Sequence, residues 1–358
     1  MISRRNFAQT AAIASGALAL PAAGLALPLA GAASATPAPL ATPAAAPQAT
    51  AATARPPRLG PLHRVRTDVL DVAYHVAGPA DGTPVVLLHG WPYSPAGSYA
   101  EVAPRLARDG YRCYVPYLRG HGPTRFLAAD TPRSGQQAAI GADLIGLLDA
   151  LDVDRALLAG YDWGGRAANV VAALWPERCL GLVSVNNYLI QQLATADEPL
   201  APALESGYWY FFYFLTERGR KGLAADPKEF ARVIWRRASP QWRFTEAELD
   251  EAAEQWTNPD YVDVVLHSYR HRLAAAPGAA AYEELERRLA AQPPITVPAV
   301  TLDGREDGVT PWTDGSASRA HFTGPRRHHV VDRAGHTLPQ ERPDAFAAAV
   351  REAATLGR

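Results

Sequence analysis

The residues best suited to covalent chemistry lie in one short segment, residues 160–165, which read Gly-Tyr-Asp-Trp-Gly-Gly. An apolar run at 156–159 precedes the segment and predicts a buried strand, and residues 166–175 after it have the composition of a helix. Glycines between a strand and a helix let the backbone turn sharply and expose one side chain at the tip of the turn. Here that side chain is Asp162, and a carboxylate in this position predicts nucleophilic displacement at a saturated carbon.

Two later loops carry the partners that such a nucleophile needs. Asp307 follows the predicted strand that ends at residue 302, and His336 follows the one that ends at 331. An isolated Asp between a strand and a helix is usually a helix N-cap, but the order nucleophile, acid, histidine favours the catalytic interpretation. We therefore expect Asp162 to be the nucleophile, His336 the base and Asp307 the group that orients the imidazole.

Other residues compete for these roles. Asp303 and Glu306 stand in the same loop as Asp307, which lies three residues beyond Gly304, where the loop can turn toward a histidine. The histidines at 328–329 lie on a predicted strand, so we expect them to be structural.

Two backbone N–H groups are expected to form an oxyanion hole, those of Trp91 and Trp163. Trp91 belongs to a His-Gly-Trp-Pro turn at 89–92 that follows an apolar strand, and Trp163 follows the nucleophile directly. A plain turn is the alternative for 89–92, because Gly and Pro mark turns in general. A cis bond between Trp91 and Pro92 would fix this turn.

The elements that must position these residues alternate between strand and helix from about residue 62 onward, which predicts an α/β fold with a mainly parallel, eight-stranded sheet. Between 188 and 294 the pattern changes to aromatic clusters and helical segments without a clear strand. We expect this stretch to form a helical lid, inserted after the sixth strand, over the carboxyl edge where open α/β sheets bind ligands. The core would comprise 59–187 and 295–358.

The first 58 residues do not belong to that core. Residues 1–35 combine paired arginines, an Ala/Leu stretch and a final Ala-Ser-Ala, and they resemble a twin-arginine export signal. We expect export machinery to deliver the protein to the periplasm or the extracellular medium. An uncleaved anchor is the alternative, but Gly and Pro interrupt an Ala-rich stretch that would insert weakly. Residues 36–58 are Ala/Pro-rich and are expected to form a disordered linker.

Composition narrows the possible partners. The net charge of −1 provides no electrostatic case for nucleic-acid binding. Cys113 and Cys179 are expected on strands that are not neighbours, so we predict two free thiols that pack in the core.

Taken together, these motifs resemble those of α/β-hydrolase-fold epoxide hydrolases and, less specifically, haloalkane dehalogenases. The residues that carry the resemblance are the segment 160–165, the turn at 89–92, a Leu-Arg-Gly-His-Gly segment at 118–122 and the Gly-His at 335–336. The resemblance spans about residues 60–356. It implies an alkyl-enzyme ester on Asp162, which water activated by His336 and Asp307 would hydrolyse without a metal or an organic cofactor.

The resemblance also implies two lid tyrosines that assist ring opening. Tyr210, in the aromatic run 208–214, matches the first, and Tyr269 matches the second, although Ser268 stands where a Trp is often found. A phenol can donate a hydrogen bond while it stays protonated at neutral pH. An apolar lid face is the alternative interpretation of the aromatic run.

The expected function is hydrolysis of an epoxide to a vicinal diol, with a small-molecule substrate that is apolar or aromatic. The alternative is a haloalkane or haloacid dehalogenase with the same triad, which would need N–H donors around a halide. Four tryptophans could supply those donors besides Trp163: Trp91, Trp209, Trp235 and Trp256.

Overall fold

The computed structural model describes residues 59–357. The expected export signal at 1–35 and the linker at 36–58 lie outside the described residues. Within the described part, no helix is both long enough and apolar enough to span a bilayer.

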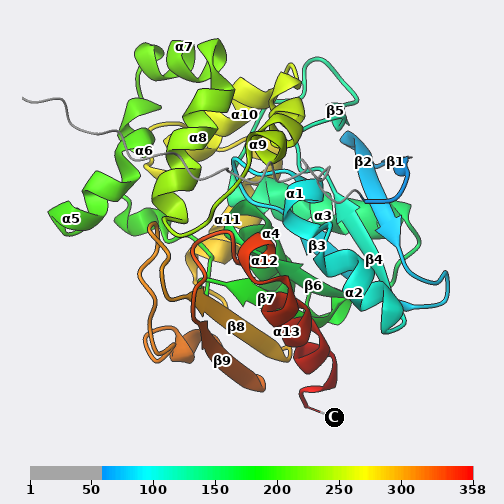
Figure 1. The fold of residues 1–358 in the computed structure, drawn as a ribbon. Coiled ribbons are helices and arrows are strands. Elements are labelled where there is room, and N and C mark those ends of the chain that lie inside the picture. The colour runs from blue at the N-terminus through cyan, green and yellow to red at the C-terminus, as the bar shows by residue number, and fades with distance from the viewer. Residues whose placement is uncertain (1–58, 358) are drawn as a thin grey trace, which may run out of the picture. The chain divides into compact units, whose positions relative to one another are not determined.

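One mixed sheet organises the described chain (Figure 1). In chain order its strands are β1 (Leu62–Arg66), β2 (Leu70–Ala77), β3 (Thr83–Leu88), β4 (Tyr111–Pro116), β5 (Arg125–Phe126), β6 (Ala156–Gly160), β7 (Cys179–Val185), β8 (Ala299–Gly304) and β9 (Arg326–Val331). The main path runs β1-β2-β4-β3-β6-β7-β8-β9 and is parallel from β4 to β9, while β2 pairs antiparallel with both β1 and β4. This path has the expected eight strands, and the long helical insertion follows the sixth of them, β7.

The additional strand, β5, has two residues and pairs with β2 at Leu70 and Asp71. A strand this short shows no alternation of apolar and polar residues, so sequence periodicity does not reveal it. The central strands show the opposite pattern: every residue of β6 and the last four of β3 are buried. Uninterrupted apolar strands are typical of parallel sheets that are covered on both faces.

Helices cover the two faces of the sheet. One face packs against α1 (Pro95–Tyr99), α2 (Val102–Arg108) and α13 (Pro343–Thr355). The other face packs against α3 (Gln137–Ala150) and α4 (Asp162–Leu174), on which α11 (Glu283–Ala290) lies. The stretch from Ser98 to Asp109, expected to be one helix, belongs to two. The first begins earlier because the Ser94 side chain accepts a hydrogen bond from the Gly97 N–H at 2.8 Å, which caps α1.

The insertion forms a cap of helices, which Figure 1 shows in green and yellow above the sheet. Its helices are α5 (Pro202–Glu205), α6 (Trp209–Tyr213), α7 (Glu217–Ala225), α8 (Pro227–Ala238), α9 (Glu246–Ala253) and α10 (Tyr261–Arg272). The remaining elements are short: η1 (Pro176–Arg178), η2 (Leu193–Thr195), η3 (Ser206–Tyr208), η4 (Glu254–Thr257), η5 (Ala280–Tyr282), η6 (Arg319–His321) and α12 (Leu338–Glu341). Although α11 lies within the range 188–294, it packs on α3 and α4 beside the sheet.

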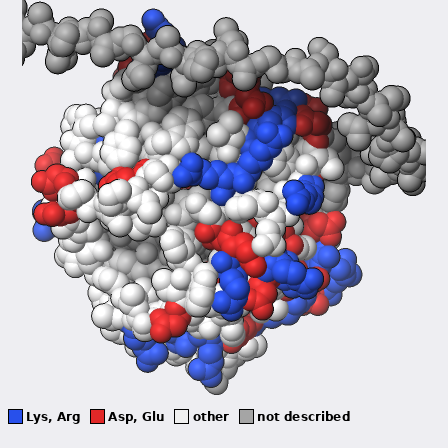
Figure 2. All heavy atoms as spheres, turned by 60° about the vertical axis from the view of Figure 1, so that its left-hand side comes forward, with Lys and Arg blue, Asp and Glu red and all other residues white. Residues whose placement is uncertain are grey.

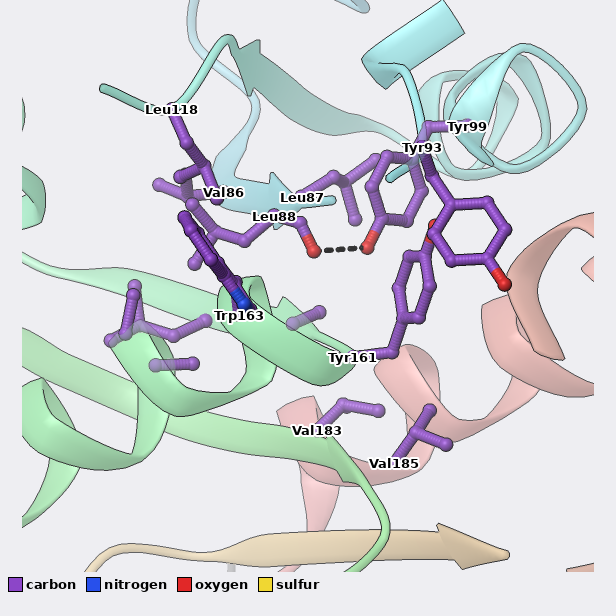
Figure 3. Close-up of a cluster of buried hydrophobic side chains, with 14 of the residues drawn as sticks. Val86, Leu87, Leu88, Tyr93, Tyr99, Leu118, Tyr161, Trp163, Val183 and Val185 are labelled. Atoms are coloured by element: carbon purple, nitrogen blue, oxygen red, sulfur yellow. Dashed lines mark hydrogen bonds between the residues drawn. The ribbon is translucent and has the colours of Figure 1, made fainter. Parts of the chain in front are cut away.

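The hydrophobic core reaches the turn between β6 and α4 (Figure 3). Tyr161 and Trp163, the two neighbours of Asp162, are both buried. In Figure 3 Trp163 lies toward Leu118, while the Tyr161 ring lies 5.5 Å from that of Tyr93. Burial of large aromatic side chains on both sides of Asp162 anchors the turn that presents it.

The two cysteines are free and buried, as expected. Cys113 lies on β4 and Cys179 on β7, and β3 and β6 separate these strands in the sheet. Burial raises the pKa of both thiols to about 12, so they stay protonated and pack as small core residues.

Candidate active site

Asp162 lies at the carboxyl end of β6 and is the first residue of α4. Its φ of 49° is in the left-handed region, which costs a non-glycine residue on the order of 1–3 kcal/mol. The glycines around it permit the close approach of neighbouring backbone: a Cβ on Gly164 would lie 2.1 Å from the Leu88 carbonyl oxygen, and one on Gly90 would lie 2.8 Å from the Asp162 Cβ. The small residues are therefore required by packing as well as by the turn.

The structure brings Asp162, His336 and Asp307 together from three different loops. The Nε2 atom of His336 is 3.8 Å from Oδ2 of Asp162, and its Nδ1 is 2.9 Å from Oδ2 of Asp307. The imidazole therefore lies between the two carboxylates, and each of its nitrogens faces one of them. This is the geometry that a base and its orienting acid require.

Asp307 is completely buried, and its oxygens have several hydrogen-bond donors. Its Oδ1 accepts from the N–H groups of Val309 and Thr310, at 2.7 and 2.9 Å, and its Oδ2 accepts from Nδ2 of Asn186 at 3.1 Å. These bonds hold the carboxylate in one orientation. The contact between Asn186 and Asp307 was not expected from the sequence, because it joins loops that are far apart in the chain.

The two competing acids serve other parts of the loop. Asp303 accepts hydrogen bonds from the Asn187 side chain and the Thr313 N–H, both at 2.8 Å. Glu306 accepts from the Ala334 N–H at 2.9 Å, two residues before His336. Neither is the carboxylate beside the imidazole.

The charges of the two carboxylates control the protonation of His336. Burial disfavours the imidazolium, but Asp307 and Asp162 outweigh this effect and raise the pKa of His336 to about 10. Burial alone would raise the pKa of the Asp162 carboxyl, but His336, Arg166 and the Trp91 N–H lower it below its ordinary value. Both acidic side chains therefore favour the protonated form of His336 in the resting site.

Trp91 contributes its backbone to the site. Its N–H donates to Oδ1 of Asp162 at 2.7 Å, and the peptide bond to Pro92 is cis. The lid holds this turn, because the Trp91 indole donates to the Tyr261 hydroxyl at 2.8 Å and the Trp235 indole donates to the Pro92 carbonyl at 3.0 Å. Trp163 is the second residue of α4, where a backbone N–H has no acceptor within the helix.

Tyr210 on α6 and Tyr269 on α10 lie together in the lid above this turn. Their ring centroids are 5.3 Å apart at 83°, and they lie 5.6 and 5.2 Å from the ring of Trp91. Burial, together with the negative charge of Asp162, raises the pKa of both phenols above the ordinary value. Both hydroxyls therefore stay protonated within range of the Asp162 charge.

The sequence reasoning missed two further residues close to the triad. Glu341 accepts from the Ser239 hydroxyl at 2.6 Å and from the Gly335 N–H at 3.0 Å, so it anchors the loop that carries His336. Arg166 is buried in α4, and its charge lowers the pKa of Asp162. The spacing of four residues between Asp162 and Arg166 was the available signal, because residues i and i+4 share one face of a helix.

Two histidines outside the triad, His267 and His328, form hydrogen bonds with protein groups. His267 interacts with the Gly135 N–H and the Pro277 carbonyl, at 3.1 and 3.0 Å, and His328 with the Thr301 hydroxyl at 3.0 Å. Among residues 59–357, no group of three or more His, Cys, Asp or Glu side chains is arranged to hold a metal ion.

A comparison with known families agrees with this arrangement of strands and loops. Residues 83–343 match the family described as the alpha/beta hydrolase fold, and this match includes Asp162, Asp307 and His336. The chain belongs to the alpha/beta hydrolase fold family. It is a hydrolase, as its motifs indicated.

The relatives of this hydrolase include epoxide hydrolases. It is 28% identical to Epoxide hydrolase A of Mycobacterium tuberculosis over 301 residues, which cover 76% of this chain and 90% of that protein. The structure of a candidate epoxide hydrolase from Klebsiella pneumoniae has 49% identity and a TM-score of 0.80, and the match covers 82% of this chain and 97% of that one. Epoxide Hydrolase A of Mycobacterium thermoresistibile has 23% identity and a TM-score of 0.65 over 83% and 98% of the two chains, which shows a shared fold.

Proposed function

We propose that this hydrolase opens an epoxide to a vicinal diol through a covalent ester on Asp162. The observation that carries the proposal is the pair of buried phenols, Tyr210 and Tyr269, whose rings pack against Trp91, the residue whose N–H binds the Asp162 carboxylate. An epoxide needs both components, a nucleophile for carbon and a proton donor for the departing oxygen. The similarity to Epoxide hydrolase A of Mycobacterium tuberculosis supports the same reaction.

In the first step Oδ2 of Asp162 attacks an epoxide carbon. Its Oδ1 is engaged by the Trp91 N–H, so Oδ2 is the oxygen with greater freedom to react. A C–O bond forms between Oδ2 and the carbon while the ring C–O bond breaks, and its electron pair moves to the epoxide oxygen. Tyr210 and Tyr269 stabilise that oxygen by hydrogen bonding as its charge develops.

Formation of the ester changes the pKa of the His336 imidazole. The Asp162 charge is one of the interactions that raise the pKa of His336, and an ester has no such charge. The pKa of His336 therefore falls, and the proton it releases balances the one that the opened oxygen takes up. The neutral imidazole, oriented by Asp307, can then act as a base.

In the second step His336 takes a proton from water, and the water oxygen attacks the Asp162 carbonyl carbon. The negative charge that develops on Oδ1 is stabilised by the N–H groups of Trp91 and Trp163. The intermediate collapses when the bond between its carbon and Oδ2 breaks, and Oδ2 takes the proton held by His336 and leaves as part of the diol. The Asp162 carboxyl group then passes its proton to His336, which restores the carboxylate and the imidazolium. The reaction on an ester is easier for water than the reaction on the original ether, which is the advantage of a covalent intermediate.

The dehalogenase alternative requires free indole N–H groups around a halide. The indole N–H of Trp91 donates to Tyr261 and that of Trp235 to the Pro92 carbonyl, so two of the tryptophans considered for this role are occupied. Release of chloride or bromide from haloalkanes, with no effect of Tyr269→Phe, would favour a dehalogenase.

Intact-mass measurement on His336→Gln tests the covalent step. With a reactive aryl epoxide we expect the mass of this variant to increase by that of the epoxide, because the ester forms and the base that hydrolyses it is missing. Asp162→Asn, which lacks the nucleophile, is the matched control and should gain no mass. An unchanged mass for His336→Gln across a panel of aryl and alkyl epoxides would refute the ester mechanism.

We also propose that the protein is exported through residues 1–35. Replacing both Arg4 and Arg5 with Lys should retain the full-length chain in the cytoplasm of the producing cell, since paired arginines are what this class of signal requires. Fractionation and immunoblotting measure the outcome, and unchanged export of the variant would argue against a twin-arginine signal.

A further inference from the structure

Two neighbouring arginines, Arg166 and Arg272, form no ion pair with an acidic residue of the described part of the chain. Arg166 follows Asp162 by one turn of α4 and is 6% exposed, and its Nε has no hydrogen-bond partner among the described residues. Arg272, the last residue of α10, is half-buried, with its guanidinium carbon 4.6 Å from the centre of the Phe211 ring. Neither guanidinium forms an ion pair with a carboxylate within residues 59–357.

A buried cation without a partner is costly, because the protein interior does not replace the water that the charge has lost. Elsewhere in the described chain the buried guanidinium of Arg119 is paired with Asp143, with two N–O distances of 2.6 Å. Arg166 is about as well buried and forms no such ion pair with a described residue, although it lies within range of the Asp162 charge. An unpaired charge at such a position fits a partner that arrives from solution.

The surroundings of Arg166 place it beside the reacting groups. Burial and the positive charge of Arg272 lower the pKa of Arg166 to about 10, while Asp162, Tyr269 and Tyr210 oppose that shift. Arg166 is therefore cationic at neutral pH and lies within electrostatic range of the nucleophile and of both phenols. The two arginines repel each other, and an anion bound near both would relieve the repulsion.

Arg272 also connects this region with the surface. It lines an open pocket of about 500 Å³ together with Tyr208, Phe211 and Phe212, which belong to the segment that leads into α6 and to α6 itself. Figure 2 shows the molecule with the side that carries α5 and α6 in Figure 1 turned forward, and a broad part of this face is uncharged. A substrate with an aromatic body and an anionic end would match the aromatic lining and the arginines.

We propose that Arg166, assisted by Arg272, binds a carboxylate of the substrate, so that the preferred epoxide is a glycidate, an epoxide with a carboxylate on one ring carbon. A guanidinium suits this role because its planar N–H groups can bind both oxygens of a carboxylate. This inference rests on the proposed epoxide hydrolysis and specifies its substrate class. The rival explanation is that Arg166 only keeps Asp162 ionised, in which case the substrate needs no charge.

Steady-state kinetics with 3-phenylglycidate and 1-phenylpropylene oxide separate the two explanations, because a methyl group replaces the carboxylate in the second compound. For Arg166→Gln we expect KM for 3-phenylglycidate to rise about tenfold or more, as a charge-assisted contact is lost. The kcat/KM for 1-phenylpropylene oxide should fall by a much smaller factor than that for 3-phenylglycidate, because this substrate has no carboxylate and loses only the effect of Arg166 on Asp162. Arg166→Lys should recover part of the loss. Arg112→Gln is the matched control, because Arg112 lies near the amino end of β4, whereas the site lies at the carboxyl edge of the sheet.

An equal fall in kcat on both epoxides would overturn the proposal in favour of a role in ionising Asp162. A higher wild-type kcat/KM for 1-phenylpropylene oxide than for 3-phenylglycidate would overturn it as well. If the wild-type enzyme hydrolyses other aryl or alkyl epoxides but neither of these two, the glycidate proposal fails. If it hydrolyses no epoxide of the panel, the proposed function fails, and calorimetry then tests the site by itself. Wild-type protein should bind 3-phenylpropanoate at least about tenfold more tightly than 3-phenylpropanamide; equal affinity would refute the carboxylate site without any variant.

Discussion

The Nδ1 atom of His336 lies 2.9 Å from Oδ2 of Asp307, although the two residues come from loops after different strands. Parallel strands β8 and β9 are neighbours, so the loops after them leave the sheet side by side at its carboxyl edge. The side chain of Asn186, which follows the adjacent strand β7, donates to the same oxygen of Asp307. The segments that follow three neighbouring strands, β7, β8 and β9, thus place Asn186, Asp307 and His336 in contact.

The contact between Asn186 and Asp307 predicts how two substitutions at position 186 rank in kcat. Asn186→Gly keeps the left-handed backbone at this position, where φ is 67°, and removes the amide that orients Asp307. Asn186→Asp adds a second carboxylate beside the first, and like charges at this distance resist ionisation. We expect kcat to fall about threefold to tenfold for Gly and further for Asp. Steady-state turnover of an epoxide measures both, and an Asp variant as active as the Gly variant would contradict this role.

The lid phenols predict a selective loss of ring opening. Tyr210→Phe or Tyr269→Phe should each lower the rate of ester formation about tenfold or more, and the double variant should lose it almost completely, because no proton donor is left for the epoxide oxygen. Tyr213→Phe, on the same helix as Tyr210, is the matched control and should retain normal turnover. Single-turnover kinetics isolate this step. Unimpaired ester formation in the double variant would show that the phenols are only part of the apolar lid.

The raised pKa of His336 predicts a pH dependence of stability. Asp307 and Asp162 stabilise the imidazolium in the folded state, so this contribution is fully present below the ordinary pKa of 6.5 and is lost as the pH rises toward about 10. The free energy of unfolding of wild-type protein should therefore decrease over this range more than that of His336→Gln, by up to about 1 kcal/mol for each pH unit. Urea denaturation at several pH values measures the difference, and parallel curves for the two proteins would contradict the raised pKa.

The close approach at Gly164 predicts a large effect of one methyl group. In Gly164→Ala the new Cβ would meet the Leu88 carbonyl, so the backbone must shift, and we expect destabilisation of about 2–3 kcal/mol. Gly146→Ala is the matched control on α3, since its Cβ would lie 3.4 Å from Thr67 and a helical Ala is favoured by roughly 0.5–1 kcal/mol over Gly. Thermal unfolding should show a lower Tm for Gly164→Ala and a higher Tm for Gly146→Ala than for wild type. If the Tm of Gly164→Ala is as high as that of Gly146→Ala, the turn tolerates a side chain.

Much of this molecule could be predicted from local sequence. The runs of apolar residues and the glycines around Asp162 indicated a strand, a tight turn and a helix, and the structure has β6 and α4 in those places. Strand periodicity and turn residues act over a few neighbours, so they are visible in a single sequence. The start of α1 at Pro95, before the expected Ser98, depended on the Ser94 cap, which is a local signal that helical spacing does not reveal.

The sequence by itself determined the α/β-hydrolase fold, the position of a carboxylate at the turn after β6, and the presence of an acid and a histidine in later loops. Tertiary structure decided which of Asp303, Glu306 and Asp307 meets the imidazole, because that depends on how the loop after β8 folds against the loop after β9. Tertiary structure also decided that Asn186 donates to that acid and that Arg166 is buried without a carboxylate partner. The physical reason is that these side chains are far apart in the sequence and meet only when the sheet and the lid have folded. Burial then shifts their pKa values, which no local sequence pattern reveals.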